Sequence, residues 1–249
     1  MCENKLWVYW KNSKRQRHKI GELTYDKENS LYTFEYSLNS DKLNVKKALE
    51  EGFILFTEFP KLNEKYESKT IFKTFKSRLP DFSRMDFSEI IAKHGVQEDE
   101  NIEFELLKKT GGRLIIDSID LIQPILKLEN KPIIRKFPLA GVEYYDVCEL
   151  DKNNKCLIKY IDFSKDTEFK LKSEPGNNFD SNAVEVYVEN NKIGYIPRFY
   201  SKIVTEAINS DNFTVKLKFD AFYKNTNCPD CLWVVMMIKP NERATCGCE

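Results

Sequence analysis

The stretch at residues 174–186, Glu-Pro-Gly-Asn-Asn-Phe-Asp-Ser-Asn-Ala-Val-Glu-Val, sets a cluster of turn formers directly before a strand-like run. Pro175 fixes one backbone angle and Gly176 allows a positive one, so the sequence predicts a sharp turn. The amide and carboxylate side chains that follow can accept hydrogen bonds from nearby backbone amides. Two interpretations stay open: an ordinary tight turn, or the edge of a binding site.

The side chains of this turn differ in which of the two interpretations they favour. Asn177, Asp180 and Asn182 can all hold the turn, and Asn182 stands where a local backbone bond is most natural. An aromatic residue followed by an acid suits a specific ligand, which favours a binding role for Phe179 and Asp180.

The rest of the second half continues this pattern of short strands and turns. Residues 198–209 are expected to form a helix, because Phe199, Ile203 and Ala207 recur every four residues. Strands are predicted at residues 167–172, 182–188, 192–196, 213–220 and 231–238.

The first half mixes strands with helices, so the predicted fold class is α+β. Strands are predicted at residues 5–10, 18–25, 31–36, 53–60 and 113–117. Helices are predicted at residues 41–51, 70–81, 82–95 and 100–112. The first of these helices is expected to be capped by Asp41 and closed by Gly52, and the last to end at a glycine pair.

The segment 124–135 contains two prolines and mixed charges without a clear period, which indicates a linker. It divides the chain into residues 1–123 and residues 136–249. A length of 249 residues fits two domains of this size.

The charge balance and hydropathy of the chain limit how it could bind nucleic acid or a membrane. Lys and Arg number 39, and so do Asp and Glu, so any nucleic-acid site must be local and not a strongly basic surface. No apolar run is long enough to span a membrane, and the start lacks a signal-peptide pattern. We therefore expect a cytoplasmic protein without membrane contact, in which free thiols are the default state of its 7 cysteines.

Two pairs of cysteines near the end of the chain are candidate metal ligands. Cys228 and Cys231 have the two-residue spacing common in zinc sites, and Cys246 and Cys248 are separated by one residue. Four thiolates in two pairs can hold a tetrahedral structural zinc. The alternative is free thiols in a hairpin and a frayed tail, and no other cofactor is expected.

Five pieces of the first half resemble the N-terminal subdomain of HipA-type serine/threonine kinase toxins. They are Lys-Ile-Gly-Glu-Leu-Thr (19–24), Tyr-Thr-Phe-Glu-Tyr (32–36), Phe-Pro (59–60) with Tyr-x-Ser after it (66–68), Phe-x-x-Phe-x-Ser-Arg-Leu-Pro-Asp (72–81) and the run from Glu-Phe-Glu-Leu to Ile-Ile-Asp (103–117). The resemblance implies a small α+β cap that contacts partner proteins. A kinase core is absent, because the sequence has no catalytic-loop or metal-binding motif, and Gly-Gly beside Lys and Arg is better explained as a helix end.

The second half resembles the HIRAN domain over residues 136–238. The matching pieces are residues 137–146, with Gly-x-x-Tyr-Tyr, residues 171–190, with Glu-Pro-x-Asn-x-Phe-Asp-x-Asn-Ala-Val, and residues 193–204, with Ile-Gly-Tyr-Ile-Pro. The resemblance implies a small β-barrel related to OB-folds, with a helix after the Gly-Tyr strand.

The HIRAN resemblance also implies a pocket for the 3′ end of single-stranded DNA. In this pocket Asp180 would accept a hydrogen bond from the 3′-hydroxyl, and Arg198 would contact a phosphate. The other implied contacts to nucleotides come from Tyr144, Tyr145, Asn177, Phe179 and Tyr195. Glu143 departs from the family, because DNA-binding members have a basic residue there, and its charge would weaken binding.

These expectations combine into a non-enzymatic intracellular adaptor. The HIRAN half would bind single-stranded DNA, and residues 1–123 would bind a protein partner. The alternative is a toxin–antitoxin or defence component whose HipA-like cap binds a kinase-like partner, with HIRAN as a protein-binding module.

Overall fold

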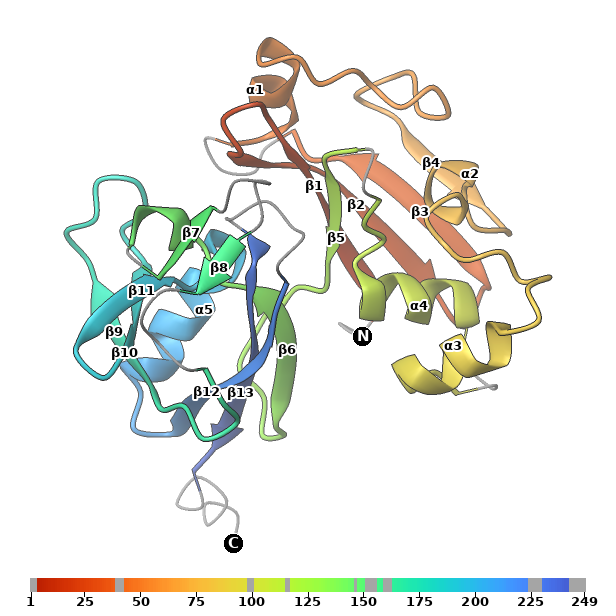
Figure 1. The fold of residues 1–249 in the computed structure, drawn as a ribbon. Coiled ribbons are helices and arrows are strands. Elements are labelled where there is room, and N and C mark those ends of the chain that lie inside the picture. The colour runs from red at the N-terminus through yellow and green to blue at the C-terminus, as the bar shows by residue number, and fades with distance from the viewer. Residues whose placement is uncertain are drawn as a thin grey trace, which may run out of the picture. The chain divides into compact units, whose positions relative to one another are not determined.

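A computed structural model describes residues 4–38, 43–97, 101–114, 117–145, 147–150, 156–158, 163–223 and 230–241. The chain divides into two compact units, Met1–Pro124 and Ile125–Glu249. Both combine helices with antiparallel sheets, which confirms the α+β class (Figure 1). No helix in the part of the chain that the structure describes is long and apolar enough to cross a membrane.

The first unit is built on a five-stranded antiparallel sheet in the order β4-β3-β2-β1-β5. Its strands are β1 (Lys5–Lys11), β2 (Arg17–Asp26), β3 (Leu31–Tyr36), β4 (Lys65–Ser68) and β5 (Ile119–Ile122). Alternate residues of β1, β2 and β3 are buried, as expected for strands with one face on a core. These three predicted strands are confirmed.

The helices of the first unit are α1 (Val45–Glu50), α2 (Lys73–Lys76), α3 (Phe87–His94) and α4 (Ile102–Thr110). Helices α3 and α4 end at Gly95 and Gly111, both in the left-handed conformation that favours glycine. The explanation of Gly-Gly as a helix end is therefore confirmed. The core is aromatic, with Phe34 stacked on Phe59 at 4.2 Å between ring centroids.

Four details of the first unit differ from the sequence-based expectations. Helix α1 is capped by Asn44, whose side chain accepts from two backbone amides, whereas Asp41 lies outside the described residues. Residues 53–60 are an irregular segment and not a strand. The helix expected over 70–81 is reduced to α2. Of the strand expected at 113–117, residues 115 and 116 lie outside the described residues, the other three are not in a strand, and β5 begins at Ile119.

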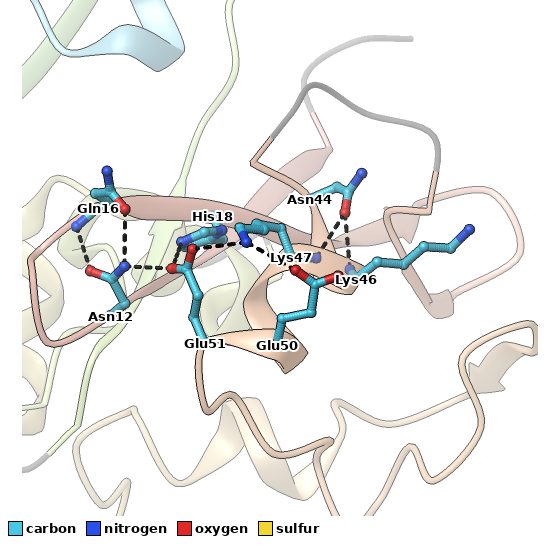
Figure 2. Close-up of polar contacts among 8 residues, drawn as sticks. All are labelled: Asn12, Gln16, His18, Asn44, Lys46, Lys47, Glu50 and Glu51. Carbon is cyan, nitrogen blue, oxygen red and sulfur yellow. Dashed lines mark hydrogen bonds and ion pairs between the residues drawn. The ribbon is translucent and has the colours of Figure 1, made fainter. Parts of the chain in front are cut away.

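A polar cluster around His18 ties β2 to the end of α1 (Figure 2). The His18 ring is fully buried, and its Nε2 lies 2.9 Å from Oε2 of Glu51. Asn12 donates to the same carboxylate oxygen at 2.5 Å, and Lys47 lies 3.7 Å from the other oxygen. Burial lowers the pKa of His18 below its ordinary value of 6.5, although Glu51 opposes this shift.

The second unit contains two three-stranded antiparallel sheets, β11-β10-β9 and β12-β13-β6, and the two-stranded ribbon β7-β8. The strands are β6 (Ile133–Pro138), β7 (Cys148–Leu150), β8 (Cys156–Ile158), β9 (Phe169–Glu174), β10 (Ala183–Val188), β11 (Asn191–Tyr195), β12 (Phe213–Phe222) and β13 (Leu232–Pro240). Strand β6 starts inside the segment expected to be a linker. The strand predictions for β9 to β13 are confirmed.

Helix α5 (Arg198–Ile208) packs against β10 and β12 and closes the core of the second unit (Figure 1). It buries Tyr200, Ile203, Val204 and Ala207, a spacing typical of an amphipathic helix. The backbone of Ala140 pairs with that of Tyr195, which joins the segment after β6 to β11. The OB-like closure of these sheets into a barrel stays a prediction.

Candidate nucleic-acid interface

Asn177 organises the turn between β9 and β10. Its Oδ1 accepts from the backbone amides of Phe179 and Asp180 at 2.9 and 3.1 Å, and its Nδ2 donates to Glu174 Oε2 at 2.7 Å. Asn177 therefore holds the turn, as its sequence position predicts. Gly176 does not use the positive φ that glycine allows. The fixed φ of Pro175 and the Asn177 bonds suffice to reverse the chain.

Asp180 fastens the turn to helix α5. Its Oδ1 accepts from the backbone amide of Asn182 at 2.9 Å, and its Oδ2 accepts from the Ser201 hydroxyl at 2.6 Å. Asn182 takes part through its backbone, since its carbonyl also accepts from Thr205 Oγ1 at 2.9 Å. The carboxylate is partly buried and fixed in orientation, so it is a positioned group and not a freely rotating one.

Tyr195 at the end of β11 lies at the centre of a hydrogen-bond chain. Its hydroxyl donates to Glu174 Oε2 at 2.9 Å and accepts from Lys192 Nζ at 2.5 Å. Lys192 also donates to Glu185 Oε1 at 2.5 Å. The strand register explains this convergence, because Glu185 pairs with Tyr195, and residues paired across strands share one face of the sheet.

These contacts, together with burial, shift the pKa values of three side chains in this hydrogen-bond network. Hydrogen bonds from Asn177 and Tyr195 lower the pKa of Glu174. Burial raises the pKa of the Tyr195 hydroxyl to about 12. Burial acts to lower the pKa of Lys192, but hydrogen bonds to Glu185 and Tyr195 outweigh it and raise that pKa. The Lys192 ammonium thus pairs directly with the Glu185 carboxylate and reaches Glu174 through the Tyr195 hydroxyl.

Tyr145 packs beside this hydrogen-bond chain, whereas Tyr144 is exposed. Tyr144 is the last residue of the 3-10 helix η1 (Val142–Tyr144), Tyr145 directly follows it, and η1 packs against β11. The Tyr145 and Tyr195 ring centroids lie 6.2 Å apart, and Lys192 Nζ lies 5.2 Å from the Tyr145 ring centroid. Tyr144, by contrast, is 81% exposed.

The candidate site residues thus fall into two groups. Tyr145, Asn177, Asp180 and Tyr195 are partly buried, and the contacts given above hold them in place. Phe179 is 85% exposed, and Arg198 at the start of α5 is exposed as well. The exposed group, with Tyr144, can reach a ligand without rearrangement. Glu143 is also exposed, next to Tyr144.

Three charged residues of this network were missed by the sequence reasoning. Glu174, Glu185 and Lys192 look like ordinary polar positions of strands when taken singly. Alternation along β10, combined with the tight connection to β11, would have placed Glu185 and Lys192 on the same face. Their convergence on Tyr195 is the information that only the pairing register supplies.

Most of the cysteines predicted to bind zinc lie outside the described residues. Cys228, Cys246 and Cys248 lie outside them, and Cys231 is buried immediately before β13. Among the described residues, no three His, Cys, Asp or Glu side chains form a group that could hold a metal ion. The predicted zinc site of Cys228, Cys231, Cys246 and Cys248 stays a prediction.

Comparisons with known proteins place a family on the second unit. Residues 136–229 match the family model described as the HIRAN domain. The chain is also similar to the crystal structure of the HIRAN domain of human HLTF, with 15% sequence identity, 47% of this chain and 85% of that chain covered, and a TM-score of 0.32. No curated protein matches the chain. The chain thus contains a HIRAN domain at residues 136–229.

Proposed function

We propose that this chain is a non-enzymatic binding protein whose HIRAN domain binds nucleic acid, specifically the 3′ end of single-stranded DNA. The supporting observation is the exposure of two aromatic rings, Tyr144 and Phe179, on a domain that matches the HIRAN family. An exposed aromatic ring normally costs solvation free energy, and two on one small domain suit a stacking ligand.

Stacking of bases on aromatic rings supplies affinity that does not depend on the nucleotide sequence. Each unpaired base that stacks on an aromatic ring contributes about 1–3 kcal/mol. Tyr144 and Phe179 are the rings we assign to this role. Tyr145 and Tyr195 are less available for stacking, because Lys192 lies over both rings and the Tyr195 hydroxyl donates to Glu174.

Phosphate contacts must come from a few local cations, because the whole chain has no net charge. Arg198 is exposed at the start of α5, and Lys170 and Lys172 are exposed on β9. An arginine can hold a phosphate with two parallel hydrogen bonds. Glu143 acts against these cations, so we expect affinity below that of a HIRAN site with a basic residue there.

Asp180 is the group we assign to the recognition of the strand end. Its two oxygens each have one donor, from Asn182 and from Ser201, and a carboxylate oxygen has room for a second hydrogen bond. A terminal hydroxyl can donate to it, whereas a terminal phosphate is repelled. The fixed orientation of the carboxylate favours a ligand group that arrives from one direction.

The direct test of this function is fluorescence anisotropy with a short single-stranded oligonucleotide labelled at its 5′ end. Phe179→Ala and Tyr144→Ala are each expected to weaken binding about 5- to 150-fold, the equivalent of one lost stack. Phe82→Ala removes a partly exposed ring outside the HIRAN match and is the matched control. If wild type and all three variants bind equally, or none binds, the assignment of the rings is wrong.

The first unit is the part we assign to a protein partner. Met85 is fully exposed, Phe82 is partly exposed, and helix α3, which follows them, has no fully buried residue. Exposed apolar side chains of this kind suit a protein contact. This favours an adaptor, or alternatively a toxin–antitoxin component with a HipA-like cap. Co-purification of the full chain with the product of a neighbouring kinase-like reading frame, lost in Met85→Glu, would support the alternative.

A further inference from the structure

The sheet β12-β13-β6 has one covered face and one that is partly open to solvent. Phe137 of β6 packs on Tyr200 of α5, with 5.2 Å between the ring centroids, and its strand partner Val234 is fully buried. Helix α5 therefore covers this face, and alternate side chains of each strand point to the other. That other side, the outer face, presents Lys136 of β6, Lys216 and Lys218 of β12, and Trp233, Val235 and Met237 of β13.

The strand register places lysines on both sides of an apolar strip. Lys218 pairs with Val235, which pairs in turn with Lys136 on the opposite strand. In the next row Lys216 pairs with Met237. Paired Cβ atoms lie about 4.5–5.5 Å apart, and the two lysines of β12 are about 7 Å apart along their strand. The ammonium groups of the outer strands thus flank the apolar side chains of β13.

The outer face is positively charged, although basic and acidic residues balance in the whole chain. Among the described residues of this face, Asp220 is the one carboxylate, and it lies 2.6 Å from Lys136 Nζ. Lys216 and Lys218 are exposed, and no carboxylate in the described part of the chain pairs with them. A local excess of cations of this kind attracts a polyanion.

Two aromatic rings continue the apolar strip at one end. Tyr223 is 43% exposed and packs edge-on to Trp233, with 5.8 Å between the ring centroids. The Trp233 Nε1 donates to the Asp230 carbonyl at 2.8 Å, which fixes the indole in orientation. Aromatic and apolar side chains beside lysines suit single-stranded nucleic acid, because the rings accept unpaired bases and the cations accept phosphates.

We propose that the outer face is a second contact surface for single-stranded nucleic acid, which binds the phosphate backbone and unpaired bases without a strand end. The end site assigned above uses the β9–β10 turn and the start of α5, whereas the outer face is the side of its sheet that α5 does not cover. The two surfaces share no residue. The inference therefore does not depend on recognition of a 3′ end.

A closed circular single strand with an internal fluorophore has no 3′ end and tests this surface in the full chain. Anisotropy between about 50 and 200 mM salt is expected to show binding by wild type. Lys216→Gln/Lys218→Gln should reduce the slope of log K against log salt by about 1.4, because each phosphate contact on a single strand contributes about 0.7. Wild type that fails to bind the circle overturns the proposal.

The matched control removes two exposed lysines of the first unit, in Lys27→Gln/Lys46→Gln. This variant has the same net charge as Lys216→Gln/Lys218→Gln and should keep the wild-type slope. An equal change of slope in the two double variants would mean that net charge, and not the outer face, governs binding, and it would overturn the proposal.

Met237→Ser separates the apolar strip from the lysines. It is expected to weaken binding of the circle severalfold at an unchanged salt slope, because it removes apolar area and no charge. Unchanged affinity in Met237→Ser would contradict a role of the strip. Matching thermal unfolding midpoints of wild type and the variants show that the fold is retained.

Two further outcomes assign the surface differently. Cosedimentation with phosphatidylserine vesicles that Lys216→Gln/Lys218→Gln impairs, while binding of the circle stays unchanged, would assign the face to a membrane surface and overturn the proposal. Wild type that binds the circle but does not prefer a 3′-hydroxyl over a 3′-phosphate on linear strands would contradict the end site and support the outer face.

Discussion

Lys192 lies between a carboxylate and two tyrosine rings, and its contacts hold the polar face of β9, β10 and β11 together. Its Nζ donates to Glu185 and lies 4.2 Å from the Tyr195 ring centroid. Glu185 is only 7% exposed, and Lys192 is the cation that pairs with its carboxylate. A buried carboxylate without a cation is strongly unfavourable.

Replacement of Lys192 by methionine is expected to destabilise the protein by about 3–5 kcal/mol, because it leaves the Glu185 carboxylate buried and unpaired. Urea unfolding measures the change. The double variant Lys192→Met/Glu185→Leu should recover most of the loss, since it removes both charges. A single variant as stable as wild type would show that the pair contributes little to the face.

His18 is expected to make the stability of the first unit depend on pH. Its pKa in the folded state lies below 6.5, so the unfolded chain binds a proton at a higher pH than the folded chain. The stabilisation is complete above about pH 6.5 and is lost as the pH falls toward the folded-state pKa. Glu51, whose pKa is lowered first by Asn12, adds a further loss only in more acidic solution.

Urea midpoints at about pH 7.5 and pH 5.5 measure this effect. Wild type is expected to be less stable at the lower pH, and His18→Gln should reduce the difference between the two midpoints. His94→Gln replaces the other histidine of the chain and measures that residue's separate share of the difference. Equal pH dependence in wild type and His18→Gln would mean that His18 is not the titrating group.

The end of strand β11 pairs through its backbone with the segment that leads into η1. The amide of Ala140 donates to the Tyr195 carbonyl at 2.9 Å, and the Tyr195 amide donates back at 2.8 Å. Gly194 permits this approach, because a Cβ there would lie 2.8 Å from the Ala140 carbonyl oxygen. Its φ of +153° is also one that side chains rarely adopt.

Gly194→Ala is therefore expected to destabilise the protein by about 1–3 kcal/mol and to weaken DNA binding, because it separates η1 from β11. Gly176→Ala is the control, since a Cβ at that position meets nothing within 4 Å. That variant should stay within about 0.5 kcal/mol of wild type. Thermal unfolding and anisotropy measure both effects, and equal behaviour of the two variants would exclude the close approach.

Elements with a regular pattern of alternating or capping residues could be predicted from the sequence. Strands β1 to β3 and β9 to β13 and the glycine ends of α3 and α4 follow from alternation and capping. Residues 53–60 could not, because distant contacts decide their conformation. The Tyr36 hydroxyl donates to the Phe59 carbonyl and accepts from the Phe56 amide, which holds this apolar run as a loop.

The candidate site shows the same limit. Asn177 and the exposed Phe179 follow from turn chemistry in one stretch of sequence. The contacts of Lys192 with Glu185 and Tyr195 could not be predicted, because they depend on strands meeting in space. Glu58 is a further case in the first unit, since its carboxylate accepts from the amides of Lys73 and Thr74 and so caps α2 from a distance.

At the scale of the whole molecule, a chain with equal numbers of basic and acidic residues carries the proposed nucleic-acid site on its second unit. The equal numbers of basic and acidic residues exclude broad attraction to DNA as the source of affinity. Recognition of a strand end fits such a chain, because it depends on a few positioned groups. Tyr144, Phe179, Asp180 and Arg198 are the groups we propose.

Anisotropy with single strands that end in a 3′-hydroxyl or a 3′-phosphate tests the central claim most directly. We expect the hydroxyl-ended strand to bind about tenfold more tightly or better at about 100 mM salt, because the Asp180 carboxylate accepts from a hydroxyl and repels a phosphate. Asp180→Asn should remove most of the difference, since the amide carries no charge. Equal binding of the two strands by wild type, or no binding of either, would contradict the account.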